Sequence, residues 1–287
     1  MALFNKQDDA GFTTDDERFL AIVGTQTGQI IENAQLYQRE EQLRLLEKEL
    51  QLAREIQIGY LPKEDIVADR LEIRGFSNPA RDVGGDFYDI FWINDHQLFF
   101  SLGDVAGKGL AASLLASGCQ AVIRTLAKTS LVGSLDMLAR ALNSHFVEAS
   151  DPGQYITLFL ATYDLDTRCL TYLNAGHVPP FIMDNESKCT RLFEGCAIVG
   201  AFVGLTFESA SLQLSPDQVL FVCSDGVTEN TDPSGKHFGD QALTEFLELH
   251  CTSRLDAIRS DLVATLKNFR QNGPQSDDIT FLLMRVK

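Results

Sequence analysis

Four short acidic motifs contain the residues of this sequence that could do chemistry. They are residues 83–89 (VGGDFYD), 103–109 (GDVAGKG), 224–226 (SDG) and 276–280 (SDDIT). Each places an aspartate beside glycine or a small polar residue, at the end of an apolar, strand-like run. One such motif alone is usually a turn or a helix cap. Together they predict one carboxylate cluster, which stays ionised only when cations neutralise it.

The donor atoms of these motifs indicate which cation the cluster would take. Carboxylate and carbonyl oxygens are the ligands of Mg²⁺ and Mn²⁺, and Val105, directly after Asp104, is the natural carbonyl donor. Zinc would require histidine or thiolate ligands, which the motifs lack. Two such ions can share a bridging carboxylate and a bridging water, and this water loses a proton near neutral pH and becomes the nucleophile. We therefore predict metal-dependent hydrolysis, with slow phosphate-monoester cleavage as a fitting reaction.

Three further polar residues lie near these motifs. Residues 103–109 fail the pattern of a phosphate-binding loop, G-x-x-x-x-G-K-[ST], so we interpret Lys108 as a residue at the entry of a helix. His177 ends a strand in an Asn-Ala-Gly-His turn and could donate to a substrate phosphate or make a structural hydrogen bond. Arg81 could contact phosphate or face solvent.

A long helix is predicted ahead of these motifs, over residues 15–61, which contain no proline. Thr14 or Asp15 could cap its start, and Gly59 and Pro62 end it. Apolar residues recur at heptad-like spacing in its second half, at Leu36, Leu43, Leu46, Leu50, Ala53 and Tyr60. This pattern predicts either a short coiled coil, and hence a dimer, or a single helix packed on its own domain.

The remaining chain must position the motifs with strands and helices. Strands are predicted at residues 71–77, 87–93, 97–102, 155–163, 169–174, 181–183, 218–223 and 279–286. Helices are predicted at residues 110–128, 134–148, 241–250 and 253–270. Residues 192–207 are glycine-rich and fit neither pattern. Hairpin-linked strands with helices inserted in pairs predict an α+β sandwich rather than alternating β-α-β units.

Composition excludes several classes of function. The formal charge of −16 over 287 residues argues against nucleic-acid or anionic-membrane binding. The six cysteines form no C-x-x-C pair, which favours free thiols in a reducing compartment. No membrane-length apolar run and no signal-peptide pattern is present. We expect a cytoplasmic protein with no nucleic-acid or membrane partner.

Read in order, the motifs resemble the PPM-type (type 2C) metal-dependent serine/threonine phosphatases, in the bacterial SpoIIE/RsbU-like branch. The resemblance covers residues 61–287, and residues 174–179 together with the Phe238-Gly239 pair add to the four motifs. It implies a four-layer α-β-β-α sandwich, in which two antiparallel sheets are flanked by helices. Residues 62–287 would then be the phosphatase domain.

The resemblance also implies a dinuclear Mn²⁺ or Mg²⁺ centre. Its expected ligands come from the four motifs: Asp86, Asp104, the Val105 carbonyl, Asp225, Asp277 and Asp278. Asp86, Asp104 and the Val105 carbonyl would bind one ion, and Asp104 would bridge to a second, which Asp225 and Asp277 complete. Asp278 is the alternative within its pair. Asp86, Asp104, Asp225 and Asp277 would be catalytic through the water that the metals activate.

Partners and the N-terminal region follow from the same resemblance. The substrate would be phosphoserine or phosphothreonine on an anti-sigma-factor antagonist, in partner-switching signalling. Residues 1–14 resemble the end of a GAF sensory domain, and residues 54–62 resemble the linker between sensor and phosphatase. Helix 15–61 would then transmit a signal and form a homodimer. The alternatives are a non-catalytic dimeric interaction module of the same fold, or another two-metal phosphohydrolase such as a nuclease.

Overall fold

The computed structural model describes residues 11–129, 134–149, 153–186, 188–271 and 273–287. Most of the segment that resembles a GAF domain, residues 1–14, therefore lies outside the described residues. The chain divides into two compact units, Met1–Leu52 and Ala53–Lys287. Helix α1, Thr14–Tyr60, begins in the first unit and ends in the second.

The start of α1 is capped by a residue other than the two predicted. The Thr13 hydroxyl accepts a hydrogen bond from the Asp16 N–H at 3.3 Å, and the Asp16 carboxylate accepts one from the Thr13 N–H at 2.9 Å. This reciprocal pair is a capping box. Thr13, rather than Thr14 or Asp15, is thus the cap, because its side chain reaches the third residue of the helix. The predicted end of the helix before Pro62 is confirmed.

The heptad-like residues of α1 are largely exposed. More than half of the side chains of Leu36, Leu43 and Leu46 is exposed to solvent, and no residue of α1 is buried within the described chain. A helix with an apolar stripe that its own chain leaves uncovered has a surface suited to a second helix. The coiled coil therefore stays a prediction that the stripe supports.

Two antiparallel sheets form the centre of the second unit. The six-stranded sheet has the order β1 (Ile66–Val67), β2 (Leu71–Asn78), β11 (Ile279–Val286), β10 (Val219–Cys223), β7 (Phe181–Met183), β8 (Cys189–Arg191). The five-stranded sheet has the order β3 (Asp86–Trp92), β4 (Gln97–Val105), β5 (Ile156–Asp164), β6 (Cys169–Ala175), β9 (Ala210–Gln213). All neighbouring strands are antiparallel.

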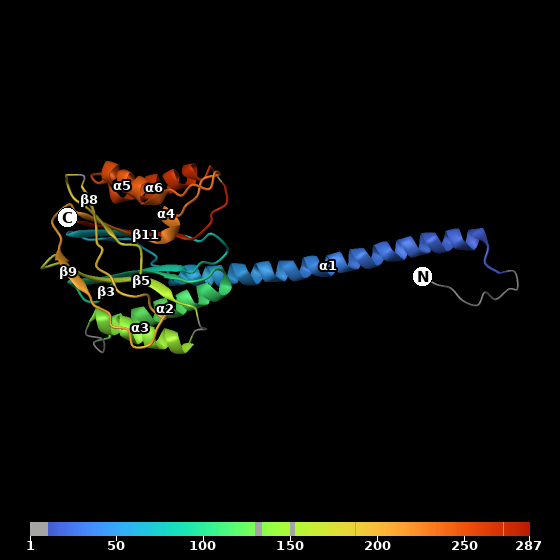
Figure 1. Cartoon of the computed structure of the whole chain (residues 1–287), viewed down its shortest axis with the longest axis horizontal. Coiled ribbons are helices and arrows are strands. Elements are labelled where there is room, and N and C mark those ends of the chain that lie inside the picture. Colours follow the sequence, from blue (N-terminus) through green and yellow to red (C-terminus); the bar gives the residue numbers. More distant parts are fainter. Residues whose placement is uncertain (1–10, 130–133, 150–152, 187, 272) are drawn as a thin grey trace. The chain divides into compact units, whose positions relative to one another are not determined.

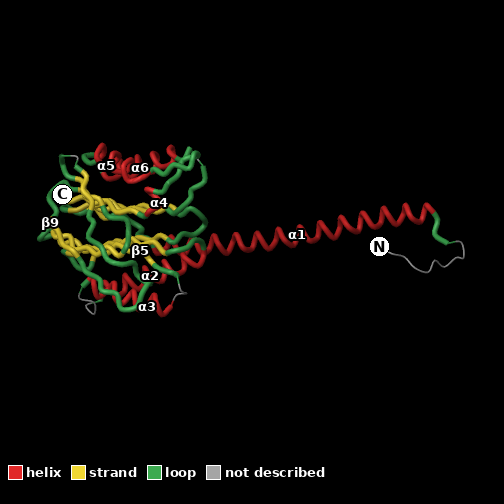
Figure 2. Tube along the Cα trace, viewed as in Figure 1, coloured by secondary structure: helices red, strands yellow, loops and turns green. Residues whose placement is uncertain are grey.

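Helices cover the outer face of each sheet (Figure 1). The five-stranded sheet carries α2 (Leu110–Lys128) and α3 (Leu135–Ala149), and the six-stranded sheet carries α5 (Gly239–His250) and α6 (Leu255–Phe269). The single-turn helix α4 (Asp225–Thr228) follows β10. Figure 2 shows the strands enclosed between two helical layers. The predicted four-layer α+β sandwich is confirmed.

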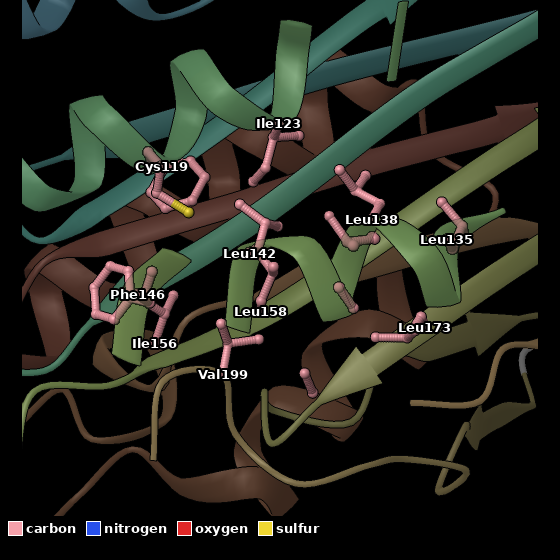
Figure 3. Packing of buried hydrophobic residues seen from close by; sticks show 14 of the residues in the cluster. Cys119, Ile123, Leu135, Leu138, Leu142, Phe146, Ile156, Leu158, Leu173 and Val199 are labelled. Carbon is pink, nitrogen blue, oxygen red and sulfur yellow. The ribbon is translucent and has the colours of Figure 1, made fainter. Parts of the chain in front are cut away.

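Three buried clusters hold these layers together. One lies between the two sheets, and the other two lie between each sheet and its helices. Figure 3 shows the cluster in which Cys119 and Ile123 of α2 pack with residues of α3 and β5. Among the described helices, α2 is the one long and apolar enough to cross a membrane by length and composition. Here its apolar face packs on the five-stranded sheet.

Residues 192–207, which the sequence pattern left unassigned, form no strand of their own. Isolated bridges attach this segment to the five-stranded sheet, Cys196 to Ala175 and Val199 to Ile156. The segment therefore lies along that sheet without extending it.

Candidate metal centre

Two of the predicted ligands lie on neighbouring strands of the five-stranded sheet. Asp86 is the first residue of β3 and stands directly opposite Asp104, near the end of β4. Opposed residues of an antiparallel pair project from the same face, so the two carboxylates are close neighbours. Asp86 is buried, and its Oδ2 has no hydrogen-bond partner within the described chain.

The other carboxylates come from the six-stranded sheet. Asp225 opens α4 just after β10, and Asp277 and Asp278 directly precede β11, the strand paired with β10. The negative charges of these three residues all act on Asp104. The ends of strands from both sheets therefore converge, as the sequence motifs predicted.

Burial and mutual repulsion make these carboxyl groups hard to ionise. Burial first, and then the charges of Asp225, Asp277 and Asp278, raise the pKa of Asp104 to about 7. Burial, Asp104 and Asp278 raise the pKa of Asp86 well above its ordinary value. Burial, followed by the charges of Glu229 and Asp277, raises the pKa of Asp225. Bound cations would relieve this repulsion.

Asp278 contacts the backbone of the first motif. Its Oδ1 accepts the Ala80 N–H at 2.7 Å, and its Oδ2 accepts the N–H groups of Gly85 and Asp86 at 2.7 Å and 3.3 Å. Both carboxylate oxygens are thus engaged by the segment that carries Asp86. Through these contacts Asp278 helps to position Asp86. Asp277 is the more exposed of the two neighbouring aspartates.

The oxygens at the centre fit a hard dication. A Cβ on Gly85 would lie 2.8 Å from the Val105 carbonyl oxygen and 3.6 Å from Asp104 Oδ1, so the glycine keeps space open beside these two donors. Asp86 Oδ2 is a buried carboxyl oxygen with no hydrogen-bond partner among the described residues. No three Asp, Glu, His or Cys side chains of the described residues already form a metal cage. In this structure Asp277 and Asp278 contact protein partners instead.

The partner of Asp277 is Lys108, whose side chain does more than the predicted helix entry. Its Nζ donates to Asp277 Oδ2 at 2.7 Å and to the Ser276 carbonyl at 3.0 Å. Lys108 does precede α2 by two residues. No sequence pattern indicates this contact, because the two residues are far apart along the chain.

The contacts of His177 favour the structural alternative. Its ring is buried, with Nδ1 2.9 Å from the hydroxyl oxygen of Thr157, and burial lowers the pKa of His177 to about 4. The Asn174 side chain accepts the His177 N–H and donates to its carbonyl. A buried neutral ring in a closed turn is poorly placed to meet a substrate phosphate. Arg81 is exposed and lies ahead of Asp86, where contact with phosphate stays a prediction.

Two glutamines that sequence reasoning overlooked hold the motif backbones. Gln57, in the part of α1 that belongs to the second unit, donates to the Gly84 carbonyl at 2.7 Å and accepts the Gly84 N–H at 3.2 Å. Gln275 donates to the carbonyls of Asp277 and Asn78 at 2.7 Å and 2.8 Å. Neither glutamine belongs to a motif, so only the fold identifies these contacts.

Comparison with known families agrees with this geometry. The sequence model described as "Stage II sporulation protein E (SpoIIE)" matches residues 94–287. The chain belongs to the SpoIIE family. The part that matches the SpoIIE family includes Asp104, Asp225 and Asp277, whereas Asp86 lies ahead of it.

Curated relatives of this SpoIIE-family chain are longer proteins. Protein IcfG from Synechocystis sp. is 29% identical over an alignment of 262 residues, and the match covers 82% of this chain and 41% of that protein. Phosphoserine phosphatase RsbP from Bacillus subtilis is 28% identical over 242 residues, 84% of this chain and 58% of that protein. The chain thus spans about half the length of these relatives.

Solved structures of similar fold include the "SiaA-PP2C domain of Pseudomonas aeruginosa". Its TM-score is 0.74 at 21% identity, covering 85% of this chain and 98% of that one. RsbX in complex with magnesium has a TM-score of 0.57 at 12% identity, covering 78% of this chain and 99% of that one. At these identities the likeness establishes the PP2C fold.

Proposed function

We propose that this chain is a metal-dependent phosphoprotein phosphatase that hydrolyses phosphoserine or phosphothreonine. The observation that carries the proposal is the convergence of Asp86, Asp104, Asp225 and Asp277 from two sheets into one cation-poor cluster. Membership of the SpoIIE family and similarity to a protein named as a phosphoserine phosphatase support the reaction class.

The proposed cofactors are two Mn²⁺ or Mg²⁺ ions. Asp86, Asp104 and the Val105 carbonyl would hold one ion, and Asp104 with Asp225 and Asp277 would hold the other. When bound, such ions make water acidic enough to attack phosphorus and offset negative charge on the phosphoryl group. The magnesium complex of RsbX, a protein of similar fold, supports the choice of a hard dication.

The chain's own residues prepare this centre. Asp278 fixes the amides of Gly85 and Asp86, which holds the Asp86 carboxylate at the open end of β3. The Asp104 carboxyl, with its pKa raised to about 7, is partly protonated at neutral pH. Loading the centre therefore requires Asp104 to release a proton, so metal affinity should rise as the pH passes through 7.

The decisive experiment uses Asp104→Ala and Asp225→Ala with a phosphoserine peptide. Each variant should lose roughly 10³-fold or more in kcat/KM with Mn²⁺, because each removes a ligand of the reacting centre. Circular dichroism should show that both variants remain folded. Full hydrolysis by both variants in metal-free buffer would reject the proposal, and cleavage of oligonucleotides alone would favour a nuclease.

The substrate, the location and the assembly belong to the same proposal. We infer a cytoplasmic homodimer, joined through α1, that acts on a phosphorylated anti-sigma-factor antagonist. The exposed apolar stripe of α1 supports the dimer, and the strong negative charge argues against nucleic-acid substrates. Assays against candidate phosphorylated antagonists, with and without Mn²⁺, test the substrate. A chain that binds no metal would instead be a non-catalytic interaction module.

A further inference from the structure

Lys108 stands in a short loop whose backbone only glycine adopts easily. Its neighbours Gly107 and Gly109 have φ angles of +107° and +83°. A residue with a side chain is strained at such angles, so both glycines are needed for this path of the chain. The loop connects β4, which carries Asp104, to α2, and it presents Lys108 to the opposite sheet.

Lys108 pairs with the carboxylate oxygen of Asp277 that does not accept a backbone N–H. Asp277 Oδ1 already accepts the Asp278 N–H at 2.9 Å, whereas Oδ2 accepts Lys108 Nζ at 2.7 Å. The Ser276 carbonyl, 3.0 Å from Nζ, fixes the ammonium in place. Across the described residues, Lys108 is the one basic side chain within ion-pair distance of the five carboxylates that were predicted as metal ligands.

We propose that Lys108 is an internal competitor for the metal ion at Asp277. It neutralises Asp277 in the metal-free protein and must release Oδ2 before a dication binds there. This inference rests on the proposed function, because it requires a metal at Asp277. It follows that the ion at Asp277 binds more weakly than the ion held by Asp86 and the Val105 carbonyl, where no lysine has to leave.

A purely structural role for Lys108 predicts the opposite effect. If the lysine served only to hold the segment around Asp277, its removal would loosen a ligand and weaken metal binding. If it competes, its removal should strengthen metal binding. The sign of the change in affinity thus separates the two roles.

The test is calorimetric titration of the full chain with Mn²⁺, comparing Lys108→Gln, Lys108→Arg and the wild type. Lys108→Gln should bind the weaker ion about two- to five-fold more tightly, the range expected from an exposed ion pair. Lys108→Arg, which can still pair with Asp277, should stay near the wild type. Lys267→Gln, at an exposed lysine of α6, is the charge-matched control and should change nothing.

A double-variant cycle separates competition from a general effect of charge. In an Asp277→Asn background, Lys108→Gln should no longer alter Mn²⁺ affinity, whereas a general charge effect would persist. Unchanged or weaker binding by Lys108→Gln in the wild-type background would overturn this inference alone. A wild-type chain that binds no Mn²⁺ would overturn the proposed function as well.

Discussion

At the scale of single residues, Asp104 is where burial and charge act most clearly. The sequence predicted it as a ligand because an aspartate beside glycine at a strand end is a local pattern. The contacts that shape its neighbours could not be predicted in this way. Lys108 reaches Asp277, and Asp278 reaches the amide of Gly85, only after the two sheets have packed.

The raised pKa of Asp104 predicts how the metal-free protein responds to pH. As the pH rises from about 4 to about 7, the Asp104 carboxyl becomes ionised in the unfolded chain while it is still protonated in the folded one. The stability that the protonated group contributes at low pH is therefore lost over this range. In the presence of a chelator, Asp104→Asn should be more stable than the wild type at pH 7.5, by on the order of 3 kcal/mol. Near pH 4 the difference should vanish. Urea unfolding at the two pH values checks this, and an equal difference at both would contradict it.

Asp277 and Asp278 are neighbours that should behave differently without metal. Asp278→Asn would remove the negative charge that three backbone N–H groups face, and it would place an amide NH₂ where one carboxylate oxygen accepts. It should therefore lower the free energy of unfolding by roughly 2–3 kcal/mol. Asp277→Asn removes only a partly exposed ion pair and should cost roughly 0–1 kcal/mol. Urea unfolding with a chelator measures both, and equal losses would reject the distinction.

At the scale of elements, sequence patterns located the long and apolar segments best. The predicted bounds of α2, β7 and β11 match the structure, since strong periodicity or unbroken apolar runs define them. β1, β8, β9 and α4 were missed: they have only two, three, four and four residues, and none has the unbroken buried apolar run that marks the short strand β7. Such short elements owe their conformation to neighbouring strands rather than to their own pattern.

Helix α2 ties the end of α1 to the sheet that carries Asp86. The Gln120 side chain donates to the carbonyls of Tyr60 and Tyr88 at 2.9 Å and 3.0 Å. The Arg124 guanidinium forms a two-pronged ion pair with buried Asp89 of β3. The last turns of α1 thus belong to the second unit, and hydrogen bonds such as that from Gln120 to the Tyr60 carbonyl hold them there.

The apolar stripe of α1 predicts that two chains associate. Leu43→Asp combined with Leu50→Asp should halve the molar mass seen by light scattering, because charges in a heptad core prevent pairing. Lys48→Asp, an exposed change on the same helix outside the heptad set, is the control and should leave the mass unchanged. A wild-type mass equal to one chain would reject the coiled coil.

At the scale of the whole PP2C fold, each sheet supplies only part of the proposed metal centre. Asp86 and Asp104 belong to the five-stranded sheet, whereas Asp225 and Asp277 adjoin the six-stranded one. A centre divided in this way exists only while the buried cluster between the sheets is intact. Metal binding and the packing of the sheets should therefore stabilise each other.

This coupling predicts that Mn²⁺ protects the fold. At one hundred times its dissociation constant, the ion should raise the free energy of unfolding by about 2.7 kcal/mol. Asp86→Asn and Asp225→Asn, one from each sheet, should each reduce this gain at the same Mn²⁺ concentration. Urea unfolding with and without Mn²⁺ measures it. An unchanged midpoint, with Mn²⁺ shown to be bound, would contradict the coupling.

The position of β11 has a consequence for how the protein is made. This strand lies between β2 and β10 and pairs with β2 from Leu71 opposite Val286 to Asn78 opposite Ile279. It is the last element of the fold to leave the ribosome, yet it occupies the middle of its sheet. Until it emerges, β2 lacks this neighbour and Asp277 has not met the other carboxylates. A nascent chain consequently lacks part of the proposed metal centre, so the proposed hydrolysis could begin only after translation has passed this strand.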